Sequence, residues 1–136
     1  MSPLAFADTG FWIALFDARD EHHLQAKEGL RLAASGYRLA LSDFVLYETI
    51  TYLNCSVKRH DLAVNFIDSI GPAGLRMFQV DGTARAEALD LFIKYADKAF
   101  SFTDCTSFVI IRQQGIGEYF GFDDHFTQMG CRPALR

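Results

Sequence analysis

One stretch near the N-terminus decides the fold, Leu4-Ala-Phe-Ala-Asp8-Thr9-Gly-Phe-Trp-Ile-Ala-Leu-Phe16. Its first four residues are apolar and the fifth is a charged turn-former, which predicts a short buried strand that ends at Asp8. Thr9 is suited to capping the helix that we expect over residues 11–16. Because Asp8 carries the only charged side chain among the first 16 residues, a lone carboxylate is expected at the end of a buried strand.

Beyond this stretch, strand-like and helix-like segments alternate along the chain. Apolar periodicity and capping residues predict helices over 21–34, 43–57, 60–70, 81–96 and 103–114. Strands are predicted over 38–41, 77–80 and 119–122, with a short edge strand over 131–134. This alternation predicts a single α/β domain over residues 1–136, with a mainly parallel central sheet flanked by helices.

Composition excludes several classes of protein. Half of the 136 residues are hydrophobic and 22% are charged, so the chain is not intrinsically disordered. The net charge of −4 argues against a general binder of polyanions. No apolar run approaches the roughly 20 residues of a membrane helix and no leader pattern opens the chain, so we expect a cytoplasmic protein. The three cysteines, Cys55, Cys105 and Cys131, are too far apart for a zinc framework, and each is expected to be a small core residue.

Four carboxylates stand in apolar surroundings, where an unpaired charge is costly. They are Asp8, Glu48, Asp104 and Asp123. Glu48 is the most informative, because it is the only charge inside an apolar helix that we expect to be largely buried. Asp8 and Asp123 both follow predicted strands, whose carboxyl ends meet at one edge of a parallel sheet. No Lys or Arg is close to the four in sequence, and oxygen ligands select a hard cation, Mg²⁺ or Mn²⁺.

Each acid except Glu48 also has an ordinary structural explanation. Asp8 can cap the following turn, and Asp104 suits the N-terminus of a helix. Asp123 and its neighbour Asp124 can belong to an ordinary turn. A shared site explains all four acids together better than separate local roles do.

Four segments surround these acids in order: Phe-Ala-Asp-Thr at 6–9, Ser-Asp-Phe-Val-Leu-Tyr-Glu-Thr at 42–49, Phe-Ser-Phe-Thr-Asp-Cys-Thr-Ser-Phe at 100–108, and Phe-Gly-Phe-Asp-Asp-His-Phe at 120–126. In order and spacing they resemble the four motifs of the PIN-domain family. Together with Met129-Gly130, the last segment is typical of VapC-type toxins. The resemblance covers essentially the whole chain.

The resemblance implies an endoribonuclease that depends on Mg²⁺ or Mn²⁺. It implies that the catalytic and metal-binding residues are Asp8, Glu48, Asp104 and Asp123. It further implies structured RNA such as tRNA or rRNA as substrate, a homodimer, and a VapB-like antitoxin as partner protein.

Two positions depart from the family pattern. Many members have Asn or Ser where Gly10 stands, and Thr or Ser where Gly121 stands. The expected supporting residues are Thr9, Ser101, Thr103 and Asp124. No histidine is required for the chemistry, and His125 matches a family position that is often structural.

RNA binding requires cations, and several are available near the predicted site. The candidates are Lys58, Arg59, Lys94, Lys98, Arg132 and Arg136, each of which is equally explained as part of a solvated surface. Most aromatic residues are expected in the core, with Tyr47, Tyr52 and Tyr95 as candidates for stacking on bases.

Two other classes of protein compete with the nuclease. A PIN-like module with weak or no catalysis, binding RNA or a protein, is motivated by Gly121. A phospho-accepting signalling domain fits poorly, because Asp8 is not part of an acidic pair. The Asp-x-Asp motif of dehalogenase-type phosphatases is also missing, since residue 10 is Gly.

Overall fold

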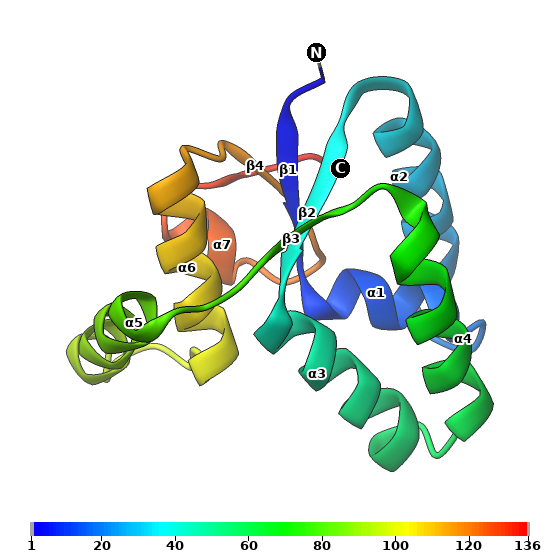
Figure 1. Cartoon of the computed structure of the whole chain (residues 1–136), viewed down its shortest axis with the longest axis horizontal. Coiled ribbons are helices and arrows are strands. Elements are labelled where there is room, and N and C mark those ends of the chain that lie inside the picture. The colour runs from blue at the N-terminus through cyan, green and yellow to red at the C-terminus, as the bar shows by residue number, and fades with distance from the viewer. Residues whose placement is uncertain (1, 136) are drawn as a thin grey trace.

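The computed structural model describes residues 2–135 and contains one five-stranded sheet, in which all neighbouring strands are parallel (Figure 1). The strands are β1 (Leu4–Ala7), β2 (Arg38–Ser42), β3 (Arg76–Phe78), β4 (Glu118–Phe120) and β5 (Arg132–Pro133). Their order across the sheet is β3-β2-β1-β4-β5. The predicted α/β domain with a parallel sheet is confirmed.

Helices flank the sheet on both sides. They are α1 (Thr9–Phe16), α2 (His23–Gly36), α3 (Asp43–Thr51), α4 (His60–Ile70), α5 (Gly82–Lys94), α6 (Phe102–Gln114) and α7 (His125–Gln128). A π-helical turn (Tyr52–Ser56) follows α3, and a 3₁₀ turn (Gly71–Ala73) follows α4. Figure 1 shows α1, α2 and α4 on one side of the strands and α5, α6 and α7 on the other. Among residues 2–135, no helix has both the length and the apolar character needed to cross a membrane.

The strand β1 lies at the centre of the sheet because its residues suit burial on both faces. Ala5, Phe6 and Ala7 are fully buried. Phe6 is in register with Ala40 of β2 on one side and with Tyr119 of β4 on the other. The strand order reverses at β1, which is where parallel sheets open a crevice beyond their carboxyl ends. Asp8 is the residue that follows β1 at this point.

The short helix α7 was not predicted. It has four residues, too few for an apolar period to show in the sequence. Its buried Phe126 stacks on Tyr119, with ring centroids 5.0 Å apart, and on Phe6, with centroids 6.1 Å apart. This packing fixes the chain immediately after Asp123 against the central strands.

The expectation that the helix over 43–57 is largely buried is wrong. Regular α-helix ends at Thr51, and only Val45, Thr49 and Leu53 of α3 and the π-helical turn are buried. One face of α3 packs on α1, α4 and α6, and the other faces solvent. Tyr47 on that outer face is 60% exposed.

The expectation that all three cysteines lie in the core is wrong for Cys55. This residue lies in the π-helical turn and is exposed. Cys105 and Cys131 are buried as expected, and burial raises the pKa of each thiol to about 11.

Candidate active site

Asp8 joins the central strand to the first helix and is tied by its backbone on both sides. Its N–H donates to the carbonyl oxygen of Phe120 at the end of β4, at 3.0 Å. Its own carbonyl accepts from the N–H of Phe11 at 3.0 Å, which begins α1. The N-terminal capping residue of α1 is therefore Asp8, and the prediction that Thr9 caps this helix is wrong. The Asp8 carboxylate makes no capping bond and stays available inside the crevice.

The Asp8 carboxylate is a buried acid among other acids. The residue is 5% exposed, and burial raises its pKa well above the usual value of 3.8. The charges of Asp104 and Asp123 raise this pKa further, and that of Glu48 adds a smaller effect. The N–H of Thr9 opposes the shift. The fold thus brings the other three acids that were predicted from the sequence within electrostatic reach of Asp8.

Asp104 is held by a reciprocal cap at the start of α6. Its N–H donates to the hydroxyl oxygen of Ser101 at 3.0 Å, and its Oδ2 accepts from the N–H of Ser101 at 3.1 Å. Burial raises the pKa of the Asp104 carboxyl, while the Ser101 N–H and the ring of His125 lower it. The backbone of α6 therefore determines where this carboxylate points.

His125, which the sequence matches to an often structural position of the family, lies in contact with the acids. Its Nδ1 lies 3.0 Å from Oδ2 of Asp104 and 3.9 Å from Oδ1 of Asp123. Its ring meets Phe100 edge to face, with centroids 5.3 Å apart. In the sequence, the only sign of its role is that it lies two residues after Asp123. Its contact with Asp104 joins positions that are 21 residues apart along the chain.

Glu48 and Asp123 lie at the rim of the crevice. Glu48 is half-buried on α3 and borders a surface hollow with Thr103. The Asp123 side chain is 49% exposed, and its Oδ1 accepts from the N–H of His125 at 3.1 Å. Asp124 is exposed and begins α7 without a side-chain capping bond.

Two glycines border Asp8. A Cβ atom at Gly121 would lie 3.4 Å from Cβ of Asp8 and 3.3 Å from the ring of Tyr119, so a side chain there would press on both. A Cβ atom at Gly10 would lie 3.9 Å from Oδ2 of Asp8, which leaves ordinary room. The two departures from the family pattern therefore both fall against the same carboxylate.

The donor set suits a hard cation. Within residues 2–135, no Lys or Arg forms an ion pair with Asp8, Glu48 or Asp123, and the buried hydroxyl oxygen of Thr9 has no hydrogen-bond partner. Carboxylates that lack a protein counter-ion favour Mg²⁺ or Mn²⁺. In the same residues, no three His, Cys, Asp or Glu side chains already converge on one point. Rotation of these side chains would have to accompany binding of an ion.

Among residues 2–135, none of the candidate cations forms an ion pair with one of the four acids. Arg59 is engaged in a two-pronged bond to Asp61, with N–O distances of 2.9 and 2.7 Å, which lowers the pKa of Asp61 to about 2. Lys58 is exposed two residues after the π-helical turn, in a left-handed backbone conformation with φ of 62°. Arg132 is exposed in β5.

Lys94 is the last residue of α5, and Lys98 lies between α5 and α6. The ammonium of Lys94 lies 5.3 Å from the ring centroid of Tyr95, and that of Lys98 lies 3.9 Å from Asp97. Lys98 is therefore part of the loop that leads into α6. Arg136 lies outside the described residues.

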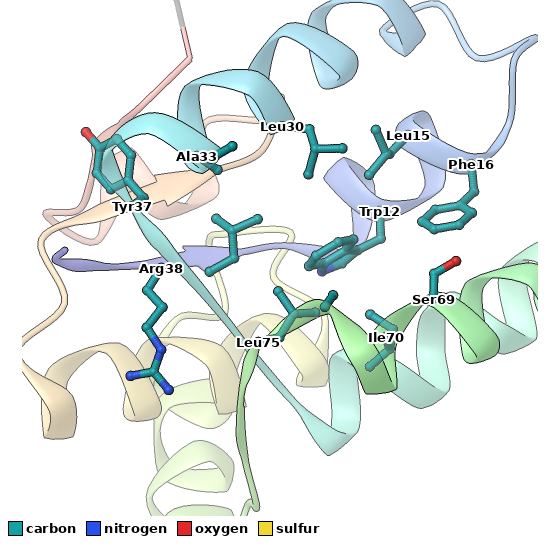
Figure 2. Close-up of a pocket in the computed structure, with 14 residues that line it drawn as sticks. Trp12, Leu15, Phe16, Leu30, Ala33, Tyr37, Arg38, Ser69, Ile70 and Leu75 are labelled. Atoms are coloured by element: carbon teal, nitrogen blue, oxygen red, sulfur yellow. The ribbon is translucent and has the colours of Figure 1, made fainter. Parts of the chain in front are cut away.

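The structure also contains a separate apolar cavity of about 320 Å³, and none of the four acids lines it. Figure 2 shows Trp12, Leu15, Leu30, Ile70 and Leu75 around it, carried by α1, α2 and the chain at the end of α4. Such a lining suits an apolar group and offers no ligands to a metal ion.

A parallel five-stranded sheet with acids gathered beyond its central strand is the arrangement expected of a PIN domain. The PIN-domain family model matches residues 5–130, and the chain belongs to this family. It is 34% identical over 130 residues to the 23S rRNA-specific endonuclease VapC20 of Mycobacterium tuberculosis, which covers 93% of this chain and 95% of the relative. The crystal structure of that relative, described as a sarcin–ricin loop cleaving toxin, matches with a TM-score of 0.81.

More distant proteins share the same fold. A VapC ribonuclease of Archaeoglobus fulgidus is 26% identical over 127 residues, covering 90% of this chain and 79% of the relative. VapBC2 of Rickettsia felis, solved bound to a DNA fragment from its promoter, matches with a TM-score of 0.70 at 13% identity over 96% of both chains. The resemblance to the PIN-domain family stated from the sequence motifs is confirmed.

Proposed function

We propose that this chain is a metal-dependent endoribonuclease that acts as the toxin of a toxin–antitoxin pair. The observation that carries this proposal is the buried Asp8 carboxylate, which lies within electrostatic reach of three further acids at the end of β1. The 34% identity to a 23S rRNA-specific endonuclease over 93% of the chain supports the same conclusion.

In this proposal, Mg²⁺ or Mn²⁺ is held by Asp8 and Asp104, with Glu48 and Asp123 as further ligands, directly or through water. Such an ion supplies a more acidic bound water and neutralises charge on the phosphate being attacked. The chemistry needs no covalent intermediate with the protein. It needs oxygen ligands for the ion, which these four carboxylates supply once their side chains have turned toward it.

The rest of the site serves to position the acids. Backbone bonds to Phe120 and Phe11 hold Asp8 rigidly, and the Ser101 cap holds Asp104. His125 lies against the same Asp104 oxygen that Ser101 binds and limits its rotation. Fixed geometry of this kind lowers the entropic part of the barrier.

The substrate class we propose is structured RNA, either rRNA or tRNA. The name of VapC20 makes 23S rRNA the first substrate to test. Phosphate contacts are proposed for Lys58, Arg59, Lys94 and Lys98, and Lys58 is favoured because it follows the segment that borders Glu48. We further propose that the partner protein is a VapB-like antitoxin, and the fold shared with a solved VapBC complex supports this proposal. We also propose that the protein is a homodimer and that it acts in the cytoplasm.

The test is cleavage of 23S rRNA and of a tRNA pool by the purified protein with Mg²⁺, with Mn²⁺ and with EDTA. Cleavage is expected only with metal. Asp8→Asn and Asp104→Asn are each expected to reduce the rate by at least about 100-fold, because loss of supporting groups alone costs roughly 10- to 100-fold at metal sites.

Asp68→Asn is the matched control, because Asp68 is an exposed acid on α4. It is expected to cleave at the wild-type rate. Cleavage that survives EDTA would contradict the proposal. Metal binding without cleavage of any RNA would favour the alternative of a binding module with weak or no catalysis.

A further inference from the structure

We call the carboxylates of Asp8, Glu48, Asp104 and Asp123 the acidic centre. Two surface hollows border it, and Tyr52 lines both. The first, of about 480 Å³, is lined by Glu48, Tyr47, Tyr52 and Thr103, among others. The second, of about 320 Å³, is lined by Tyr52 and Asp123 together with other residues. Tyr52 therefore lies between a hollow that Glu48 borders and a hollow that Asp123 borders.

The first hollow presents bare aromatic surface. Tyr47 is 60% exposed and Tyr52 is 45% exposed, although each ring carries a large apolar face. Tyr52 is also the residue at which α3 changes into the π-helical turn, whose closing bond runs from the N–H of Val57 to the Tyr52 carbonyl at 3.0 Å. π-Helical turns are frequently found at functional sites.

The second hollow contains a flat stack. The rings of His22 and Phe122 lie 4.4 Å apart between centroids and 10° from parallel. The His22 ring is oriented by Gln25, whose Oε1 lies 2.8 Å from its Nδ1. An ordered ring pair beside Asp123 is a platform on which a further flat group can stack.

The lining of both hollows favours a base over a phosphate. Neither contains a Lys or Arg, and each contains a carboxylate of the acidic centre, which repels a phosphate that no cation accompanies. The hydroxyls of Thr51, Ser56 and Thr103 in the first hollow can bond the polar edges of a base. Unpaired bases of RNA are bound in this way, between aromatic faces and hydroxyl groups.

We propose that the two hollows hold the unpaired nucleobases on either side of the phosphate placed at the acidic centre, with the Tyr52 ring between them. This inference rests on the proposed ribonuclease function. It assigns Tyr52 and Tyr47 to base stacking at the first hollow, and His22 with Phe122 to the second. Bases that are free to stack in this way belong to a loop or another unpaired segment of RNA.

Binding tests this proposal independently of cleavage. The probe is an RNA hairpin with the sarcin–ricin loop sequence, in which 2-aminopurine replaces one loop base at a time, added to the full chain with Ca²⁺, which takes oxygen ligands as Mg²⁺ does. Stacking on Tyr52 is expected to quench 2-aminopurine at one or two adjacent positions. Tyr52→Ala is expected to remove this quenching and weaken binding by roughly tenfold, whereas Tyr52→Phe retains both.

Phe92→Ala is the matched control, since Phe92 is 50% exposed on α5 and lines neither hollow. It is expected to bind and quench like the wild type. A second arm uses hairpins that lack the base at the quenched position. Removal of the base and Tyr52→Ala are each expected to weaken binding, and together by no more than either alone. Independent, additive losses would overturn the proposal.

The outcomes for the base sites and for the nuclease are separable. If the wild type cuts RNA with Mn²⁺ and Tyr52→Ala cuts and binds equally well, the base sites are overturned and the nuclease stands. If quenching depends on Tyr52 but no metal condition gives cleavage, the base sites stand and the nuclease is overturned.

Discussion

At the scale of single residues, Asp8 is a source of instability in the metal-free protein. Burial and the neighbouring acids raise its pKa above the value of 3.8 that it has in an unfolded chain. The folded state therefore holds the proton more tightly than the unfolded state does. The protonated Asp8 carboxyl favours the folded state. Its contribution to the free energy of unfolding is fully present below pH 3.8 and is lost as the pH rises from 3.8 through the higher pKa of the folded protein.

The substitution Asp8→Asn is accordingly expected to stabilise the protein in EDTA at pH 7 while it abolishes cleavage. A gain of about 1 kcal/mol or more corresponds to a rise in Tm of roughly 3 °C or more for a domain of this size. The gain is expected to shrink toward pH 3.8, where the aspartate itself takes up a proton. Thermal unfolding followed by circular dichroism at both pH values measures it. Asp68→Asn serves as control, and a lower Tm for Asp8→Asn at pH 7 would contradict the account.

Sequence reasoning located the four acids because each is a rare charge in an apolar segment. This signal depends only on the neighbouring sequence. It was correct for Asp8 and Asp104, which are buried, as expected of a lone charge in an apolar segment. His125 gave no such signal, because its contact with Asp104 exists only when α7 packs against the end of α6. Gly121 was noticed as a departure, but its position against Asp8 required the paired ends of β1 and β4.

At the scale of elements, the N-terminus of α6 links stability to the site. Ser101→Ala removes the hydroxyl that accepts from the Asp104 N–H, but it keeps the backbone N–H that donates to the Asp104 carboxylate. The expected loss is about 1 kcal/mol, typical of a helix cap. Chemical denaturation measures this loss, and the cleavage rate of the same variant is expected to fall because the first turn of α6, which carries Asp104, loses one of its two capping bonds.

Two serines provide the comparison for Ser101. Ser42 caps α3 through the N–H of Val45 at 3.2 Å, so Ser42→Ala is expected to cost a similar free energy of unfolding. Ser69 lies near the end of α4 and bonds only the carbonyl of Asn65, so Ser69→Ala is expected to be nearly neutral. Equal effects at all three positions would show that the cap on α6 has no special role.

The elements themselves were predicted well where pattern and length agreed. Helices with clear caps, such as α5 after Asp81, start where the capping residue stands. The helix over 43–57 was misjudged because apolar residues all round a helix indicate burial only when every face has a neighbour. In this fold the outer face of α3 has none among the described residues, and Tyr47 on that face is open to solvent.

At the scale of the whole molecule, the net charge of −4 limits how RNA can be held. Binding to single strands loses affinity with salt at a slope of about −0.7 per neutralised phosphate. Arg59 is already paired with Asp61 and Lys98 lies beside Asp97, so few cations face a phosphate unopposed. We expect a log–log slope between about −1 and −3, shallow for a protein that binds nucleic acid.

Lys58→Ala is expected to make the slope of log affinity against log salt concentration shallower by about 0.7. The same substitution is expected to weaken binding to all RNA sequences alike. Titrations of labelled RNA at several salt concentrations measure both effects. Lys27→Ala, an exposed lysine on α2, is the control and is expected to leave the slope unchanged. A wild-type slope steeper than about −5 would show that a basic surface exists elsewhere.

The order of strands in the sheet also has a consequence for synthesis. The central strand β1 leaves the ribosome first, but its partner β4 begins only at Glu118, and Asp123 follows later still. A growing chain therefore carries its first acid long before the neighbouring strand that positions it and the last acid that completes the group. If the protein cuts ribosomal RNA, this topology delays assembly of its acidic site until β4 and Asp123 have left the ribosome that makes it.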